Sequence, residues 1–131
     1  MLVNKDYDIP SFVNNNTLLI VSSYSGNTEE TISALQQAIK QKAQIVGITT
    51  GGKLEKMSIE HGFPIVKVPS GLPPRAALGY SLVQQLYILH QFELISNFFE
   101  EELQAAFELL QQEQANIKKI TQSWAKMLSK K

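Results

Sequence analysis

Three short runs of apolar residues in the first half of the chain have the length and composition of buried β-strands. They span residues 17–22, 44–49 and 64–68. The first run is apolar at successive positions, which is typical of a strand covered on both faces in a parallel sheet. Leu2 and Val3 look like the end of one more strand.

Apolar residues recur at helical spacing between these runs and after them. Residues 28–42 and 54–61 predict two helices, the second ending at Gly62. A third, longer helix is expected from Pro73-Pro74 onward. Because its apolar residues cover more than one face, we expect it to be largely buried, in part against a second subunit. This alternation of strands and helices predicts an α/β fold, a doubly wound parallel sheet flanked by helices.

A different pattern follows residue 96, where apolar residues recur every three or four positions. The stripe consists of Phe99, Leu103, Ala106, Leu110, Ile117, Ile120, Trp124 and Met127, and Glu113 interrupts it. The spacing fits either one coiled-coil helix or two helices that turn near residues 115–116. We expect this helical C-terminal extension to serve packing or subunit contact, and together with the preceding helix it favours a homodimer.

Composition and charge exclude several classes of function. The chain has 131 residues, enough for one domain, and its twelve basic and twelve acidic residues cancel. It therefore has no basic field for nucleic acid or an anionic membrane. No apolar run approaches the roughly 20 residues of a membrane span. Cysteine is absent, which excludes thiolate chemistry, and the cytoplasm is the expected location.

The segment between the first strand and its helix is the strongest candidate for chemistry. It carries three hydroxyls, those of Ser23, Ser25 and Thr28. The unpaired N–H groups of a first helical turn, together with the helix dipole, favour an anion such as phosphate at this corner. The alternative is that Asn27 caps the helix with Glu30 as its capping-box partner, and both can hold at once.

The pattern Ser-x-Ser-Gly-x-Thr-x-Glu in residues 23–30 resembles the phosphate-binding motif of the sugar isomerase (SIS) domain. A second segment, Pro-Ser-Gly-Leu-Pro-Pro-Arg-Ala-Ala in residues 69–77, resembles the bifunctional phosphoglucose/phosphomannose isomerase family. Residues 5–10 and 49–54 are similar to intervening segments of that family. The resemblance runs through most of residues 1–95.

This resemblance implies a SIS domain of flavodoxin-like or Rossmann-like architecture. It implies interconversion of glucose 6-phosphate or mannose 6-phosphate with fructose 6-phosphate through a cis-enediol, without a metal or redox cofactor. Ser23, Ser25 and Thr28 would hold the substrate phosphate. Arg75 aligns with the arginine of the family's Pro-Arg motif and would be the catalytic residue that stabilises the enediolate. The loops after the three strands would meet at one edge of the sheet.

The same resemblance leads us to expect an incomplete site. Residues 1–95 would be a SIS domain without its first strand and glycine-rich turn, and residues 96–131 a helical linker toward an absent second SIS domain. The family's general base, ring-opening histidine and catalytic lysine lie in or near that second domain. Neither His61 nor His90 is expected to act as a catalyst, so we expect the chain alone to be inactive.

Two alternatives remain open. The chain could be a non-catalytic SIS regulatory module that binds a sugar phosphate. It could also be too incomplete to fold stably, because an unpaired strand edge and apolar surface would stay exposed.

Overall fold

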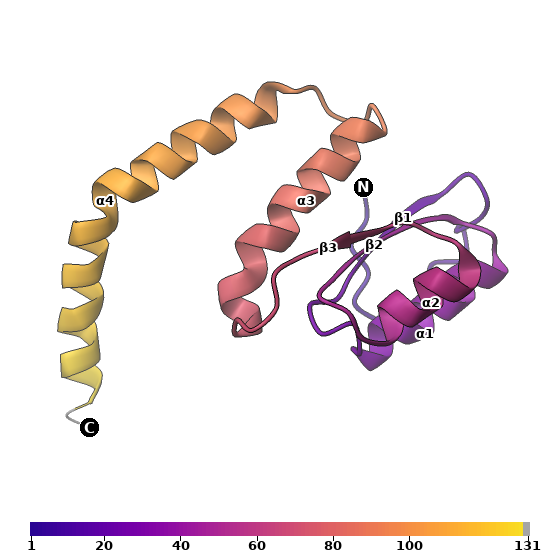
Figure 1. Cartoon of the computed structure of the whole chain (residues 1–131), viewed down its shortest axis with the longest axis horizontal. Coiled ribbons are helices and arrows are strands. Elements are labelled where there is room, and N and C mark those ends of the chain that lie inside the picture. The colour runs from indigo at the N-terminus through magenta and orange to yellow at the C-terminus, as the bar shows by residue number, and fades with distance from the viewer. Residues whose placement is uncertain (130–131) are drawn as a thin grey trace. The chain divides into compact units, whose positions relative to one another are not determined.

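The computed structural model describes residues 1–129 and contains a three-stranded parallel sheet in the order β1-β2-β3 (Figure 1). The strands are β1 (Leu18–Ser22), β2 (Gln44–Thr49) and β3 (Ile65–Lys67). Leu18 lies opposite Gln44 in the first pair, and Gly47 lies opposite Ile65 in the second. The three predicted strands are confirmed, although β3 is shorter than expected.

β1 forms an edge of the sheet and is only partly covered. Val21 is its one buried residue, whereas all of β2 after Gln44 is buried. The prediction that the first strand is buried on both faces was wrong, because the strand order places β2 in the middle. Leu2 and Val3 are exposed and form no strand.

Helices cover both faces of the sheet, which confirms the doubly wound arrangement. Helices α1 (Glu29–Lys40) and α2 (Gly52–His61) contact each other and pack on one face. The buried core between them and the sheet consists of Val21, Leu35, Ala38, Ile45 and Leu54. Because successive strand residues point to opposite faces, Val46 and Ile48 of β2 lie on the other side, where they pack with Ile88 of α3 (Leu78–Gln91).

The third helix is less buried than its sequence predicted. It begins with the 3-10 turn η1 (Pro74–Ala77), whose first positions hold proline, and continues as α3. Ala77 and Ile88 are buried, but Leu78 and Leu82 are exposed. The expectation of a largely buried helix is therefore wrong for this chain by itself, because the sheet covers only one face of a helix that is apolar on several.

The chain divides into two compact units after Ile88. The second unit contains α4 (Phe98–Leu128), which is a single helix whose axis bends partway along (Figure 1). Of the two sequence alternatives, the single helix is confirmed. None of the helices in residues 1–129 combines the length and apolar composition that a membrane span requires.

Candidate functional site

The loops that follow β1, β2 and β3 meet at one edge of the sheet, as predicted, and Tyr24 joins all three. Its backbone oxygen accepts the N–H of Thr50 at 3.0 Å and the Thr50 hydroxyl at 2.8 Å. Its phenol donates to the backbone oxygen of Pro69 at 2.9 Å and accepts the N–H of Leu72 at 3.0 Å. One residue of the first loop therefore holds both other loops.

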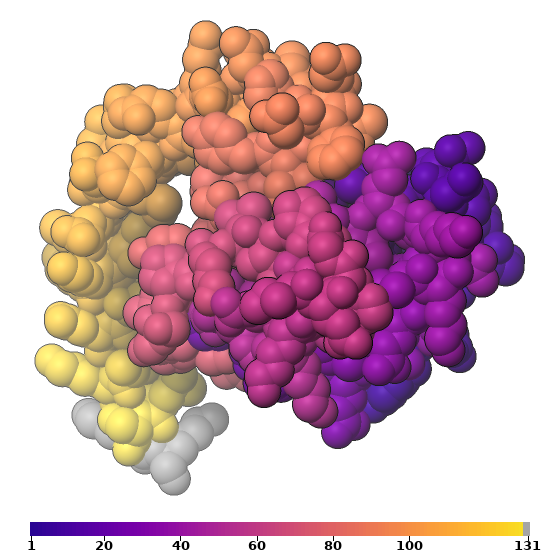
Figure 2. Space-filling view, turned by 45° about the vertical axis from the view of Figure 1, so that its right-hand side comes forward, coloured from indigo at the N-terminus to yellow at the C-terminus, as the bar shows by residue number. Residues whose placement is uncertain are grey.

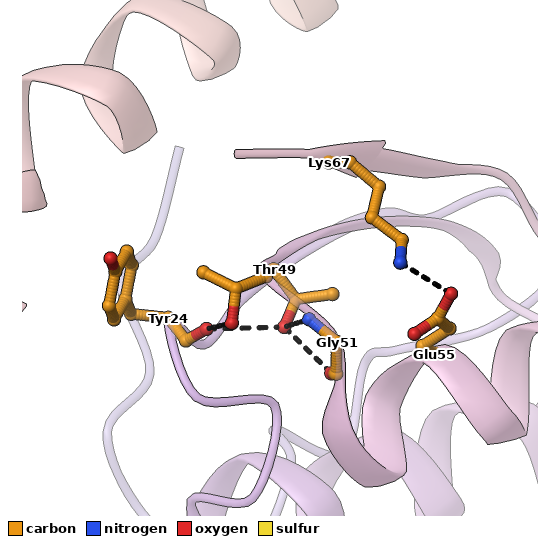
Figure 3. Close-up of polar contacts among 6 residues, drawn as sticks. Tyr24, Thr49, Gly51, Glu55 and Lys67 are labelled. Carbon is orange, nitrogen blue, oxygen red and sulfur yellow. Dashed lines mark hydrogen bonds and ion pairs between the residues drawn. The ribbon is translucent and has the colours of Figure 1, made fainter. Parts of the chain in front are cut away.

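The first and second loops also approach each other backbone to backbone. Gly26 has a φ of 68°, and a Cβ atom on it would lie 1.8 Å from the backbone oxygen of Gly51. The fully buried hydroxyl of Thr49 donates to that same oxygen at 2.9 Å and accepts the Gly51 N–H at 3.1 Å (Figure 3). Only glycine fits at position 26, because both its conformation and the space around it exclude a side chain.

The structure brings the three predicted hydroxyls into one turn but gives them different roles. Ser23 is buried, and its Oγ lies 2.8 Å from Oγ1 of Thr28. Ser25 is exposed, and its Oγ accepts the N–H of Asn27 at 3.2 Å. Because that oxygen acts as an acceptor, the Ser25 proton stays available to a ligand, and so does one of the two protons of the Ser23–Thr28 pair.

The start of α1 has no side-chain cap. Thr28 is the N-cap residue, and no side chain accepts a hydrogen bond from the first-turn N–H groups. Asn27 serves α2 instead: its Oδ1 accepts the N–H of Lys53 at 3.0 Å, while its Nδ2 donates to the backbone oxygen of Ser25. The predicted capping of α1 by Asn27 and Glu30 is therefore wrong. The first-turn N–H groups of α1 can instead point at a ligand.

Arg75 lies in η1, just after the loop that Tyr24 holds, and its side chain is exposed. Among residues 1–129 the one ion pair joins Lys67 and Glu55 (Figure 3), so no carboxylate in that range neutralises Arg75. Its guanidinium is available to an anionic ligand.

Sequence reasoning missed Tyr24 and also a cavity of about 370 Å³ beside the hydroxyl loop. The cavity lies against β1 and α1, and its polar lining comes from Asn4, Lys5, Asp6, Ser22, Thr28, Glu30 and Thr31. The N-terminal segment reaches it because Gln37 of α1 donates a 2.8 Å hydrogen bond to the backbone oxygen of Tyr7. The one available signal was the resemblance of residues 5–10 to a family segment.

Two glutamates give the first turn of α1 a negative field. Glu29 accepts a 3.4 Å hydrogen bond from the phenol of Tyr7. The charge of Glu30, followed by burial and by Glu29, raises the pKa of Tyr7 above its ordinary value of 10.0. A phosphate bound at this turn would meet the same field, so its hydroxyl and amide donors must offset that repulsion.

Both histidines lie outside the loops that carry the predicted hydroxyls and Arg75. His61 is exposed in the last turn of α2. His90 places Nδ1 at 3.1 Å from the backbone oxygen of Ile95, and its ring centroid lies 5.8 Å from that of Phe99. Within residues 1–129, no group of three or more histidine, aspartate and glutamate side chains could hold a metal ion.

Known proteins match about two-thirds of the chain, from near its N-terminus. Residues 6–94 match the SIS domain family. The bifunctional phosphoglucose/phosphomannose isomerase of Caldicellulosiruptor bescii is 52% identical over 95 residues, which cover 72% of this chain and 28% of that protein. The protein of the same name from Thermoplasma volcanium is 55% identical over 78 residues, 60% of this chain and 24% of that protein.

A relative named for a different activity also matches. The D-glucosamine-6-phosphate 4-epimerase of Sulfolobus acidocaldarius is 34% identical over 80 residues, 60% of this chain and 26% of that protein. The chain thus spans about a quarter of the length of these curated relatives.

Proposed function

Because the chain belongs to the SIS domain family, we propose that it supplies the phosphate-binding part of a sugar-phosphate isomerase. The reaction would interconvert glucose 6-phosphate or mannose 6-phosphate with fructose 6-phosphate through a cis-enediol. Support comes from relatives named for both activities, which are 52% and 55% identical over the matched residues.

The uncapped start of α1 is the observation that carries this proposal. A phosphate there would accept hydrogen bonds from the Ser25 hydroxyl, from one hydroxyl of the Ser23–Thr28 pair and from the first-turn N–H groups. All of these donors are neutral, so they orient the anion without the strong Coulombic attraction of a lysine or arginine. Binding through neutral donors suits a reaction whose product must also dissociate.

We assign the reacting end of the sugar to Arg75. The enediolate formed during isomerisation carries negative charge on oxygen, and a guanidinium offers two parallel N–H donors to such a group. Arg75 is exposed and unpaired among the described residues, and the loop before it is held to the hydroxyl loop by Tyr24.

This chain alone is expected to catalyse little or no isomerisation. Proton transfer between C1 and C2 needs a base within hydrogen-bond reach. Near the site, Glu55 is paired with Lys67 and Glu29 accepts the Tyr7 hydroxyl. We therefore assign neither glutamate as the base. Full-rate isomerase activity of these 131 residues would contradict the expected lack of turnover.

Calorimetric titration with glucose 6-phosphate tests the phosphate site, with glucose and inorganic phosphate as comparison ligands. We expect wild type to bind the phosphate ester and not glucose. Ser25→Ala removes one donor worth about 1 kcal/mol, so affinity should fall roughly five- to tenfold. Ser96→Ala, at an exposed position between α3 and α4, is the matched control and should bind as wild type does. Equal affinity in both variants would remove Ser25 from the site.

The second candidate is a regulatory SIS module that binds a sugar phosphate without converting it. It is favoured by the same lack of an assigned base. Turnover of glucose 6-phosphate by any longer polypeptide that includes these residues would favour the isomerase, since a regulatory module would bind the ester and leave it unchanged. Both candidates keep the expectations of a cytoplasmic homodimer that binds neither nucleic acid nor membrane.

A further inference from the structure

Thr49, the last residue of β2, carries a buried hydroxyl that no step of the proposed reaction uses. Among residues 1–129, two polar side chains are buried, those of Thr49 and Ser23, and Thr49 is the less exposed of the two. Figure 2 shows the surrounding segments, coloured from indigo to magenta, as one closely packed surface. A polar group is buried only at a cost unless it forms hydrogen bonds, so its bonds indicate its role.

The Thr49 hydroxyl binds both backbone polar groups of Gly51. Its Oγ1 accepts the Gly51 N–H at 3.1 Å and donates to the Gly51 oxygen at 2.9 Å (Figure 3). The backbone oxygen of Tyr24 is a more distant acceptor, at 3.4 Å. Gly51 has a φ of 155° and a ψ of −135°, one of the many conformations open to glycine. The hydroxyl therefore fixes the backbone at the residue that precedes α2.

The start of α2 in turn holds the hydroxyl loop, residues 23–28. The N–H of Leu54 donates to the backbone oxygen of Gly26 at 2.9 Å. The N–H of Lys53 donates to Oδ1 of Asn27 at 3.0 Å. Both acceptors lie between the second and third hydroxyls of the loop, so the position of α2 determines how those hydroxyls are spaced.

The two loops are too close for either to shift by itself. A Cβ atom on Gly26 would lie 1.8 Å from the Gly51 oxygen and 2.8 Å from Oγ1 of Thr49. A Cβ atom on Gly52 would lie 2.4 Å from the backbone oxygen of Ser25. A change in the backbone at Gly51 would therefore be transmitted to the hydroxyl loop.

We propose that Thr49 is a positioning residue for the phosphate site. Its hydroxyl fixes Gly51, Gly51 fixes the start of α2, and α2 holds the phosphate donors of the hydroxyl loop at their spacing. This inference rests on the proposed function, because it assigns what keeps the proposed phosphate site in shape. A hydroxyl that served stability alone would change the free energy of unfolding and leave the affinity for phosphate unaltered.

Calorimetric titration of the full chain with glucose 6-phosphate and with inorganic phosphate tests the proposal. Thr49→Val removes the hydroxyl and keeps the branched shape. We expect its affinity for both ligands to fall at least fivefold and by the same factor, because both ligands present the same phosphate. Thr49→Ser keeps the hydroxyl and should bind within about twofold of wild type.

Ser58→Ala is the matched control, because the Ser58 hydroxyl donates to the backbone oxygen of Phe63 at the far end of α2. It should lower the melting temperature and leave both affinities within about twofold. Titrations are made well below the melting transition of every variant, so that each affinity is that of the folded chain.

The possible failures are distinguishable. A wild type that binds neither ligand would overturn the proposed phosphate site and this inference with it. If wild type binds, equal affinity in Thr49→Val would overturn the role of Thr49 alone. So would a loss that Thr49→Ser shares, an equal loss in Ser58→Ala, or a loss confined to glucose 6-phosphate.

Amide exchange in wild type tests the same coupling if Thr49→Val does not fold. Coupling between two sites is reciprocal, so phosphate bound at the hydroxyl loop should slow exchange of the Gly51 and Leu54 amides. The Gly62 amide, which bonds to the backbone oxygen of Ser58, is the comparison at the other end of α2. Unchanged exchange at Gly51, or equal slowing at Gly62, would overturn the proposal.

Discussion

The phenol of Tyr24 donates a 2.9 Å hydrogen bond to the backbone oxygen of Pro69, 45 residues further along the chain. The same phenol oxygen accepts the N–H of Leu72, so one side chain satisfies a donor and an acceptor of the third loop. That loop leads into the turn that carries Arg75. We therefore propose that Tyr24 positions the Arg75 guanidinium through the backbone of this loop.

Tyr24→Phe removes both phenol hydrogen bonds and keeps the ring. We expect the free energy of unfolding to fall by about 1–2 kcal/mol. Hydrogen exchange of the Leu72 amide should become faster. The affinity for glucose 6-phosphate should fall more than the affinity for inorganic phosphate, because the phosphate donors at the start of α1 are unchanged. Tyr80→Phe, on the exposed face of α3, is the control. Unchanged exchange at Leu72 would show that the phenol does not hold the loop.

Gly26→Ala should be among the most destabilising substitutions in the chain. Its Cβ atom would lie 1.8 Å from the Gly51 oxygen, so the two loops would have to separate. Gly71→Ala is the matched control, because Gly71 also has a positive φ but nothing lies within 4 Å of its Cβ site. That control should cost only the conformational strain of about 1–2 kcal/mol.

Urea unfolding followed by circular dichroism measures both glycine variants. Equal losses for Gly26→Ala and Gly71→Ala would contradict the close approach of the loops. A wild type without any cooperative transition would instead favour the alternative that the chain is too incomplete to fold stably.

Asn27→Ala should destabilise α2 rather than α1. The side chain accepts the N–H of Lys53, so its loss should cost about 1 kcal/mol, as for other helix caps. Asn27→Asp keeps the acceptor and should recover most of this stability, but its charge should weaken phosphate binding. Amide exchange localises the effect: faster exchange at Lys53 is expected, and a change confined to the first turn of α1 would restore the original capping assignment.

The stability of the chain should fall in alkaline solution through Tyr7. Its pKa is raised by Glu30, by burial and by Glu29. Above pH 10 the folded chain therefore holds a proton that the unfolded chain has released, so the free energy of unfolding falls as pH rises through this range. The difference between the ultraviolet tyrosinate titrations of wild type and Tyr7→Phe should give a transition with its midpoint above pH 10. A component at or below the ordinary value would contradict the effect of the two glutamates.

Several elements could be predicted because they depend on residues close together in the chain. The strand 44–49 and the helix that ends at Gly62 follow from local periodicity and from a glycine in left-handed conformation. The hydroxyls of Ser23, Ser25 and Thr28 lie within one turn, so their spacing alone places them together.

The tertiary structure decided the features that depend on partners far away in the chain. Asn27 could satisfy either α1 or α2, and only the approach of residues 51–53 to the first loop selects α2. Nothing in the sequence distinguishes Tyr24 from its neighbours in the motif. Its importance follows from the hydrogen bonds between its phenol and the backbone of Pro69 and Leu72.

The sequence by itself thus determined three strands and the helices between them, which loop carries the hydroxyls, and that an apolar stripe at helical spacing follows residue 96. The strand order, the partial cover of β1, the exposure of α3 and the hydrogen bonds between loops required the tertiary structure. The physical reason is that periodicity and backbone conformation are local properties. Burial and hydrogen-bond partnership are set by which distant segments lie side by side.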